Sequence, residues 1–516
     1  MRRLIISAFF LLLDFFPATA LSQCVIRHSQ HKPISALQDP FFHLLSSIPQ
    51  CPRTVIELRK NLQTAGAHFI TTMVANQGFH HPERGSFSFF EAVEIPESPK
   101  IPYPVGAHEL LFGHFVSPGA SHSLRLDQDP ASMSLMVELL AWDPQKTMFN
   151  FYELIGTPQG AQWFYRGDSQ DIWADTQLLH RKREPHAPIF GTRLRCSGCH
   201  LAGGPLMKEL QAPHDSWWKS ERPLPFAGRT PDPQMQEVMA TLQPPAVLQD
   251  LVLKGLRQLF SGKAFIQRQE ASLQVALRPL FCPEEINLAA SLQPLLESQE
   301  VTVPTGFFLD DRLGSASTLV AKKSDYIDAL TSLHSSFGEP PITRLDADHG
   351  WNTPIKGTAD RLAIDALVQR GRISHQFVTD VLSVDWSHPV FSPMRCELLP
   401  LVPMTWSEGW QTKFRQTLQE SHLPGASILL AHMERSQKPE PISPFLAKCA
   451  DILQTPAGVQ ALVEYLGQVR KEVSHSEISQ NSRGQILEPG FRMIFPLFTP
   501  EAMPGVLTLD ENCWPR

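Results

Sequence analysis

The sequence predicts an α+β protein, in which a β-rich N-terminal part and a mainly α-helical C-terminal part are joined by an irregular central region. Changes in residue composition and in the spacing of apolar residues along the chain support this prediction. Residues 21–180 hold short runs of apolar and aromatic side chains separated by Pro, Gly and Asn, which is typical of strands. Residues 181–232 are rich in Pro and Gly, and within residues 233–516 apolar residues recur at helical spacing.

The strand predictions concern four runs in the N-terminal part. Each run is rich in aromatic and aliphatic residues and is bounded by residues that favour turns. The last three runs are separated only by short turn segments, residues 143–146 and 156–160, so we expect them to be neighbouring antiparallel strands. The four runs are residues 86–90, 135–142, 149–155 and 162–166.

The helix predictions follow from apolar residues three and four positions apart. We expect helix stops at Pro244-Pro245 and at Leu423-Pro424-Gly425, because proline cannot continue a helix. The predicted helices lie within residues 235–242, 247–259, 362–368, 410–419 and 458–472.

The N-terminus is typical of a secretory signal peptide. Arg2 and Arg3 precede an apolar run, residues 4–13, that is too short to span a bilayer. Ala18-Thr19-Ala20 then has the small-x-small pattern of a cleavage site. We therefore expect residues 1–20 to be removed and the mature protein to be periplasmic or secreted.

Cys24 offers an alternative, because residues 21–24 have the shape of a lipid-attachment box. Two observations favour a freely soluble protein instead. Gln23 stands where a small residue is expected, and lipidation of Cys24 would leave an odd number of thiols outside the pair Cys196 and Cys199. The six remaining cysteines allow fifteen disulfide connectivities. Sequential pairing is the least entangled expectation: Cys24 with Cys51, Cys282 with Cys396, and Cys449 with Cys513.

Composition argues against several classes of protein. The net charge is −7 and no basic run stands out, so nucleic-acid binding has no electrostatic support. Beyond the N-terminus, no apolar stretch is long enough to cross a membrane, and no internal repeat indicates a solenoid or propeller. The 45 prolines among 516 residues favour turns and extended connections over one long helical array.

The strongest chemical signal is the segment Cys196-Ser197-Gly198-Cys199-His200. Two thiols at this spacing can form thioethers with the two vinyl groups of a porphyrin, and the following imidazole then lies where it can coordinate the iron. The two small residues between the thiols let the loop lie close to the porphyrin edge. A structural disulfide, which would be strained across two intervening residues, is one alternative. A thioredoxin-like redox pair and a zinc site are two more. The redox pair lacks a βαβ setting and the zinc site lacks another Cys or His pair at ligand spacing.

This segment resembles the haem-attachment motif of c-type cytochromes, over five residues and a short flank. The resemblance implies one covalent haem c within residues 181–232. Cys196 and Cys199 would be the attachment thiols and His200 the proximal iron ligand. Gly203-Gly204-Pro205, just after the motif, would let the backbone pass close to the macrocycle.

The sixth iron ligand decides between electron transfer and catalysis. Met207 and His214 are candidate distal ligands because both lie shortly after the motif. Met394, Met404 and an open position are the alternatives.

We expect an exported mono-haem protein that exchanges electrons with a redox partner protein or with a small-molecule donor or acceptor. The alternative is a mono-haem oxidoreductase with an open distal iron site that acts on a small oxidant or a nitrogen compound. The strand-rich segment leading into the motif resembles the β-sandwich mono-haem cytochromes that oxidise hydroxylamine. A haem-bearing sensor or adhesion module is a third hypothesis, for which the sequence offers no specific feature.

Overall fold

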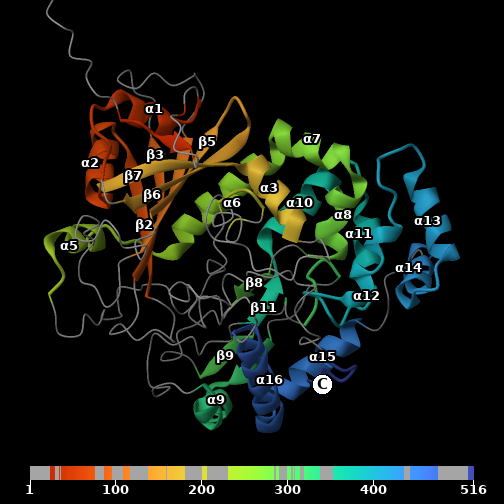
Figure 1. The fold of residues 1–516 in the computed structure, drawn as a ribbon. Helices are drawn as coiled ribbons and strands as arrows, with labels where there is room; N and C mark the ends of the chain where they lie inside the picture. Colours follow the sequence, from red (N-terminus) through yellow and green to blue (C-terminus); the bar gives the residue numbers. More distant parts are fainter. Residues whose placement is uncertain are drawn as a thin grey trace, which may run out of the picture.

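The computed structural model confirms the predicted α+β fold, with one large sheet in the N-terminal half and mostly helices in the C-terminal half (Figure 1). It describes residues 24–28, 34, 37–75, 87–95, 109–116, 137–157, 160–179, 200, 202–205, 230–283, 286–289, 299–303, 306, 308–313, 319–337, 353–434, 442–474 and 509–515.

The large sheet has seven strands in the order β1-β7-β6-β5-β4-β3-β2. Strands β2 to β7 pair with their sequence neighbours in antiparallel fashion, whereas β1 pairs with β7 in parallel. The described residues of all four predicted strand runs fall in this sheet, and the last three runs are neighbouring antiparallel strands as expected. The strands are β1 (Arg27–His28), β2 (His68–Ala75), β3 (Phe87–Ile95), β4 (Glu109–Val116), β5 (Val137–Asp143), β6 (Met148–Thr157) and β7 (Gly160–Asp168).

Helices cover both faces of this sheet. Helices α1 (Pro40–Ser47), α2 (Val55–Thr64) and α5 (Pro233–Met239) pack on one face. On the other face, α3 (Ser169–Leu179) and α6 (Pro245–Ser261) pack against aromatic side chains of the sheet. The helical cover of the sheet therefore extends beyond residue 232, and each face has its own apolar core.

Three helices lie in the part of the chain that the sequence predicted as strand-like, so that prediction was incomplete. The side chain of Asp39 caps α1 by accepting a hydrogen bond from Phe42 N at 2.9 Å. Thr54 caps α2 through Glu57 N at 3.1 Å. These caps satisfy amide groups at the first turn, and burial of the apolar faces of α1 and α2 on the sheet stabilises the helices.

Each of the two predicted helix stops also contains the proline that begins the next helix. Helix α5 ends before Pro244, but Pro245 begins α6. Likewise α13 (Trp410–Glu420) ends before Pro424, which begins α14 (Pro424–Glu434). A proline at the first helical position loses no hydrogen bond, because its missing N–H would have had no partner within the helix.

The C-terminal half is built around a separate apolar core. Helix α10 joins the two halves, because Ala359 and Ala363 pack in the same cluster as Phe149 of β6. The remaining elements are α7 (Lys263–Ala271), α8 (Leu273–Phe281), α9 (Lys323–Phe337), α10 (Thr358–Gln369), α11 (His375–Leu382), α12 (Pro393–Cys396), α15 (Ile442–Leu453), α16 (Pro456–Ser474) and two short antiparallel pairs, β8 (Ile286–Ala289) with β11 (Thr353–Lys356) and β9 (Glu300–Val303) with β10 (Leu319–Lys322).

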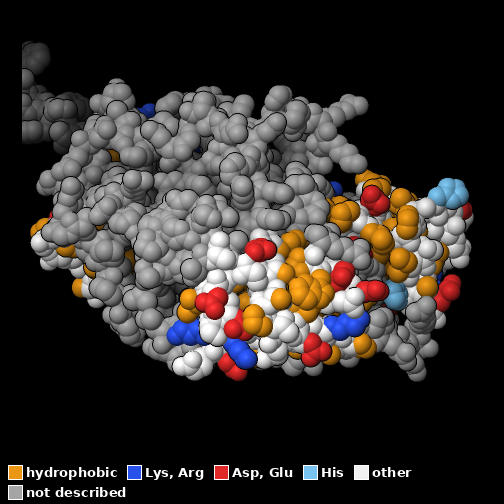
Figure 2. Space-filling model, turned by 90° about the horizontal axis from the view of Figure 1, so that it is seen from below, with side chains coloured by type: hydrophobic (Ala, Val, Ile, Leu, Met, Phe, Trp, Pro, Cys, Tyr) orange, Lys and Arg blue, Asp and Glu red, His pale blue; other side chains and the backbone are white. Residues whose placement is uncertain are grey.

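The described helices include none that is long and apolar enough to cross a membrane. On the face drawn in Figure 2, acidic and basic side chains of the described residues lie interspersed among apolar ones.

Candidate functional site around His200

His200 belongs to a tight turn that is fixed to the beginning of α3. Gly203 N donates to the carbonyl of His200 at 2.7 Å and closes the turn. Trp173 Nε1 donates to the carbonyl of Ala202 at 2.8 Å. Ser169 Oγ donates to the carbonyl of Gly203 at 2.6 Å. The turn after the Cys-x-x-Cys-His segment therefore has a defined place against α3.

The imidazole of His200 is oriented by its own turn. Its Nδ1 lies 2.9 Å from the carbonyl oxygen of Gly204. A carbonyl can only accept a hydrogen bond, so Nδ1 carries the proton and, in the neutral ring, Nε2 carries the lone pair. The ring is half-buried, and its centroid lies 5.5 Å from that of the buried Phe151 of β6. This tautomer is the one that metal-binding histidines adopt when Nε2 is the ligand atom.

Protein packing explains the two glycines of the turn, while their closeness to a macrocycle stays a prediction. Gly203 has a φ of 76°, and a Cβ there would lie 2.6 Å from Trp173 Nε1. A Cβ on Gly204 would lie 2.9 Å from Leu259 Cδ2 of α6. The positive φ and the Trp173 contact thus favour glycine at position 203, and a side chain at position 204 would require Leu259 to move.

Strand β6 forms the wall behind the His200 turn. Its side chains alternate between the two faces of the sheet, as in any strand. Phe149 and Phe151 face the α6 side, where Phe151 meets His200. Asn150 and Tyr152 face the opposite side and contact Asp39 at the start of α1. The pairing of β6 with β7 shifts register between Phe151 and Tyr152, directly behind the imidazole.

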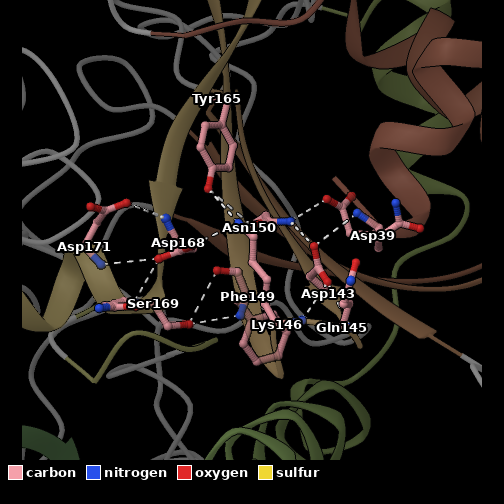
Figure 3. Close-up of polar contacts among 12 residues, drawn as sticks. Asp39, Asp143, Gln145, Lys146, Phe149, Asn150, Tyr165, Asp168, Ser169 and Asp171 are labelled. Carbon is pink, nitrogen blue, oxygen red and sulfur yellow. Dashed lines mark hydrogen bonds and ion pairs between the residues drawn. The ribbon is translucent and has the colours of Figure 1, made fainter. Parts of the chain in front are cut away.

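A buried polar network lies on the Asp39 side of this wall (Figure 3). The carboxylate of Asp39 accepts hydrogen bonds from Phe42 N at 2.9 Å, from Asn150 Nδ2 at 2.6 Å and from the hydroxyl of Tyr152. Asn150 Nδ2 also lies 3.3 Å from Asp143 Oδ2, so one amide group bridges two carboxylates. Burial raises the pKa of Asp39 to about 6, although the hydrogen bonds from Tyr152, Phe42 and Asn150 act against it.

The network continues to the beginning of α3 through Lys146. Its Nζ donates to Asn150 Oδ1 at 3.0 Å and to Asp168 Oδ2 at 2.9 Å (Figure 3). Next to Asp168, Ser169 accepts a hydrogen bond from Phe149 N at 2.9 Å while it donates to Gly203. A chain of contacts therefore connects the cap of α1 with the turn that carries His200.

The two predicted attachment thiols, Cys196 and Cys199, lie outside the described residues. The other six cysteines form the three disulfides that sequential pairing predicts: Cys24–Cys51, Cys282–Cys396 and Cys449–Cys513. Since the chain has eight cysteines, Cys196 and Cys199 are the two that these bonds leave over. The first bond also uses the Cys24 sulfur that lipid attachment would need.

The candidate distal ligands Met207 and His214 also lie outside the described residues. Met394 packs in the C-terminal core, where its Cγ closely approaches Gly425. Met404 is 63% exposed. Neither methionine belongs to the cluster that contains Phe151. Among the described residues, no group of three or more His, Cys, Asp and Glu side chains could hold a metal ion.

A second buried polar cluster lies in the C-terminal half, around Asp310. Lys356 Nζ is 3.6 Å from Asp310 Oδ2, and Arg312 N donates to Asp310 Oδ1 at 3.1 Å. Burial would raise the pKa of Asp310, but the charges of Lys356 and Arg312 outweigh it and lower the pKa. Burial lowers the pKa of Lys356 to about 8, and the charge of Asp310 offsets this only in part.

Sequence reasoning found neither polar cluster. Asp39 and Asn150 are 111 positions apart, and no local pattern joins them. Asp39 did carry a local signal, because Asp followed by Pro is typical of a helix start. Lys356 and Asp310 carry no comparable signal.

Comparisons with known proteins gave no match. No family model matches the chain, and neither do the curated proteins or the solved structures with which it was compared. The interpretation of the site depends on the residues of this chain.

Proposed function

We propose that this protein carries one covalent haem c and transfers electrons. Cys196 and Cys199 would form the thioether bonds, and His200 would be the proximal ligand. The observation that carries the proposal is the segment Cys196-Ser197-Gly198-Cys199-His200. The tautomer of His200, whose Nδ1 donates to the Gly204 carbonyl, is the one that suits coordination through Nε2. The three disulfides support the proposal, because they use every cysteine except the proposed attachment pair.

Each residue of the site has a definable part in this function. The bound haem would supply an iron that accepts and releases one electron. The Gly204 carbonyl fixes the tautomer of His200 and raises the basicity of Nε2. Phe151 shields one side of the imidazole from water, and Ser169 and Trp173 hold the turn in register. Met207 or His214 would be the second protein ligand of the iron.

The proposal includes export. Disulfides persist in oxidising compartments, and three of them suit a periplasmic or secreted protein with residues 1–20 removed. The mass of the purified protein tests this, because a mature chain that begins at Leu21 supports export and a chain that keeps Arg2 and Arg3 contradicts it.

The test of haem attachment uses the full chain, expressed in a host that exports proteins and attaches haem c. We expect the peptide containing Cys196 and Cys199 to carry the mass of one haem. The double variant Cys196→Ser, Cys199→Ser should lose this adduct. The matched double variant Cys449→Ser, Cys513→Ser also removes two cysteines but should keep it. Absence of the adduct from the wild-type peptide would overturn the proposal.

A reduced spectrum then tests electron transfer. Sharp α and β bands that carbon monoxide leaves unchanged indicate two axial protein ligands and support electron transfer. Ready binding of carbon monoxide, with a high-spin ferric form, would contradict electron transfer and support an oxidoreductase with an open distal site. In the first case, replacement of Met207 or of His214, one at a time, identifies the distal ligand by the loss of those bands.

A further inference from the structure

Asp39 is a fully buried carboxylate, and the described residues place no cation at ion-pair distance from it. Its side chain is 0% exposed, and its donors are the neutral groups of Phe42, Asn150 and Tyr152. Lys146, the cation of the network, binds the side-chain oxygen of Asn150 instead. Within the described part of the chain, no ion pair reaches Asp39. Among these residues, hydrogen bonds from neutral groups stabilise its negative charge.

A single strand separates Asp39 from the proposed haem ligand. Phe151 contacts His200 on the α6 side of β6, while its neighbours Asn150 and Tyr152 contact Asp39 on the α1 side. All three of these β6 side chains are buried, so little water screens charges across this wall. A change of charge at the metal site should therefore alter the proton affinity of Asp39.

We propose that Asp39 takes up a proton when the site at His200 is reduced, so that the redox potential of the protein depends on pH. This inference rests on the proposed function. Oxidation adds one positive charge on the α6 side of β6, and that charge stabilises the carboxylate form of Asp39. Reduction removes the charge and favours the protonated form. By linkage, protonation of Asp39 raises the potential, and the potential falls as the pH rises.

Other titratable groups around Asp39 affect how its protonation depends on pH. Burial raises the pKa of Tyr152 well above its usual range, as do Asp39 and other neighbours, so this phenol stays protonated and acts as a donor. Burial also raises the pKa of Tyr165 on β7. Burial lowers the pKa of His43 on α1, and the charge of Asp143 acts against this. The charged and titratable groups that face Asp39 or lie beside its partners are Asp143 from β5, Tyr152 from β6, Tyr165 and Asp168 from β7, His43 from α1, and Lys146 from the turn between β5 and β6.

The pKa of Asp39, raised by burial to about 6, places its titration within an accessible range. The expected coupling is about fivefold in proton affinity between the oxidised and reduced forms, at the low end of typical site-to-site couplings.

The experiment measures the midpoint potential of the haem-loaded full chain from about pH 4 to about pH 8. It compares the wild type with Asp39→Asn and with Asp250→Asn, which removes the same charge from an exposed position on α6. We expect the potential of the wild type and of Asp250→Asn to fall as the pH rises, and Asp39→Asn to lose this component. Equal pH dependence in Asp39→Asn and the wild type would overturn the inference, and so would a flat wild-type profile.

Tyr152→Phe provides a second test that keeps the carboxyl group. The hydroxyl of Tyr152 stabilises the carboxylate, so its loss should move the pH-dependent change of potential to higher pH. A change at the same pH as in the wild type would count against Asp39 as the proton acceptor. If no haem attaches to the wild type, the proposed function fails instead, and the two failures are thereby distinguished.

Discussion

Asp39 and Asp310 are both buried aspartates, one in each half of the molecule. Their surroundings shift their pKa values in opposite directions. Asp39 is 0% exposed and Asp310 is 7% exposed. Asp39 accepts hydrogen bonds from neutral groups, and burial raises its pKa to about 6. Asp310 lies beside Lys356 and Arg312, whose charges overcome the effect of burial and lower its pKa.

The difference shows that burial alone does not decide the state of a carboxyl group. Neutral donors reduce the cost of a buried charge but leave the proton able to bind near neutral pH. Nearby cations, such as Lys356 at 3.6 Å from Asp310, stabilise the carboxylate and oppose protonation near neutral pH. The cluster in the N-terminal half therefore suits proton exchange, and the cluster in the C-terminal half suits structural stabilisation.

The largest effect is expected from breaking the ion pair in the C-terminal half. Lys356→Met leaves Asp310 buried without its lysine, so we expect a loss of about 3 to 5 kcal/mol in the free energy of unfolding. Urea denaturation followed by circular dichroism measures this loss. The double variant Lys356→Met, Asp310→Leu should recover most of it, because no lone charge remains. A loss below about 1 kcal/mol in the single variant would show that the pair is not needed to hold Asp310.

The next effect concerns the pH dependence of stability that Asp39 produces. The folded state binds this proton more tightly than the unfolded chain does, because the pKa rises from 3.8 to about 6 on folding. The stabilising contribution is present below the unfolded pKa and is lost as the pH rises towards the folded pKa. Relative to Asp39→Asn, the wild type should therefore lose about 3 kcal/mol between about pH 4 and pH 7. Parallel profiles for the two proteins would contradict this assignment.

The smallest effect is expected from removing one neutral donor of Asp39. Tyr152→Phe should cost about 2 kcal/mol at neutral pH, where the acceptor is charged, and less in acid, where it is protonated. Tyr165→Phe is the matched control, since this hydroxyl contacts Lys146 and Asn150 and does not bond to Asp39. The cost of the control should change less with pH than that of Tyr152→Phe. Thermal unfolding at two pH values measures both.

Much of the fold could be predicted because its signals are local. The runs that became β5, β6 and β7 are separated by short turns, which fixes their antiparallel order. Helices α6, α10 and α16 follow from apolar periodicity. Helices α1 and α2 were missed, although Asp39-Pro40 and the spacing of Thr54 and Glu57 are typical helix starts.

The candidate site was predictable only where it is contiguous in the sequence. The segment from Cys196 to His200 is a local pattern, so it could be singled out. The contacts of His200 with Phe151 and of Gly203 with Ser169 and Trp173 join distant segments, and no periodicity encodes them. The sheet and its helices bring these residues together. The close packing of the two glycines against α3 and α6 is apparent only in the folded chain.

The order of the disulfides has a consequence for maturation. Each bond joins two cysteines that follow one another in the chain, and Cys196 and Cys199 stand between the first bond and the second. A chain that enters an oxidising compartment from its N-terminus can thus pair every thiol with the next one to arrive, with no shuffling of wrong bonds. By the same rule, the oxidant of the compartment would join Cys196 and Cys199 in a disulfide. Haem attachment would then require a dedicated reductant for this one pair, supplied while the other three remain oxidised.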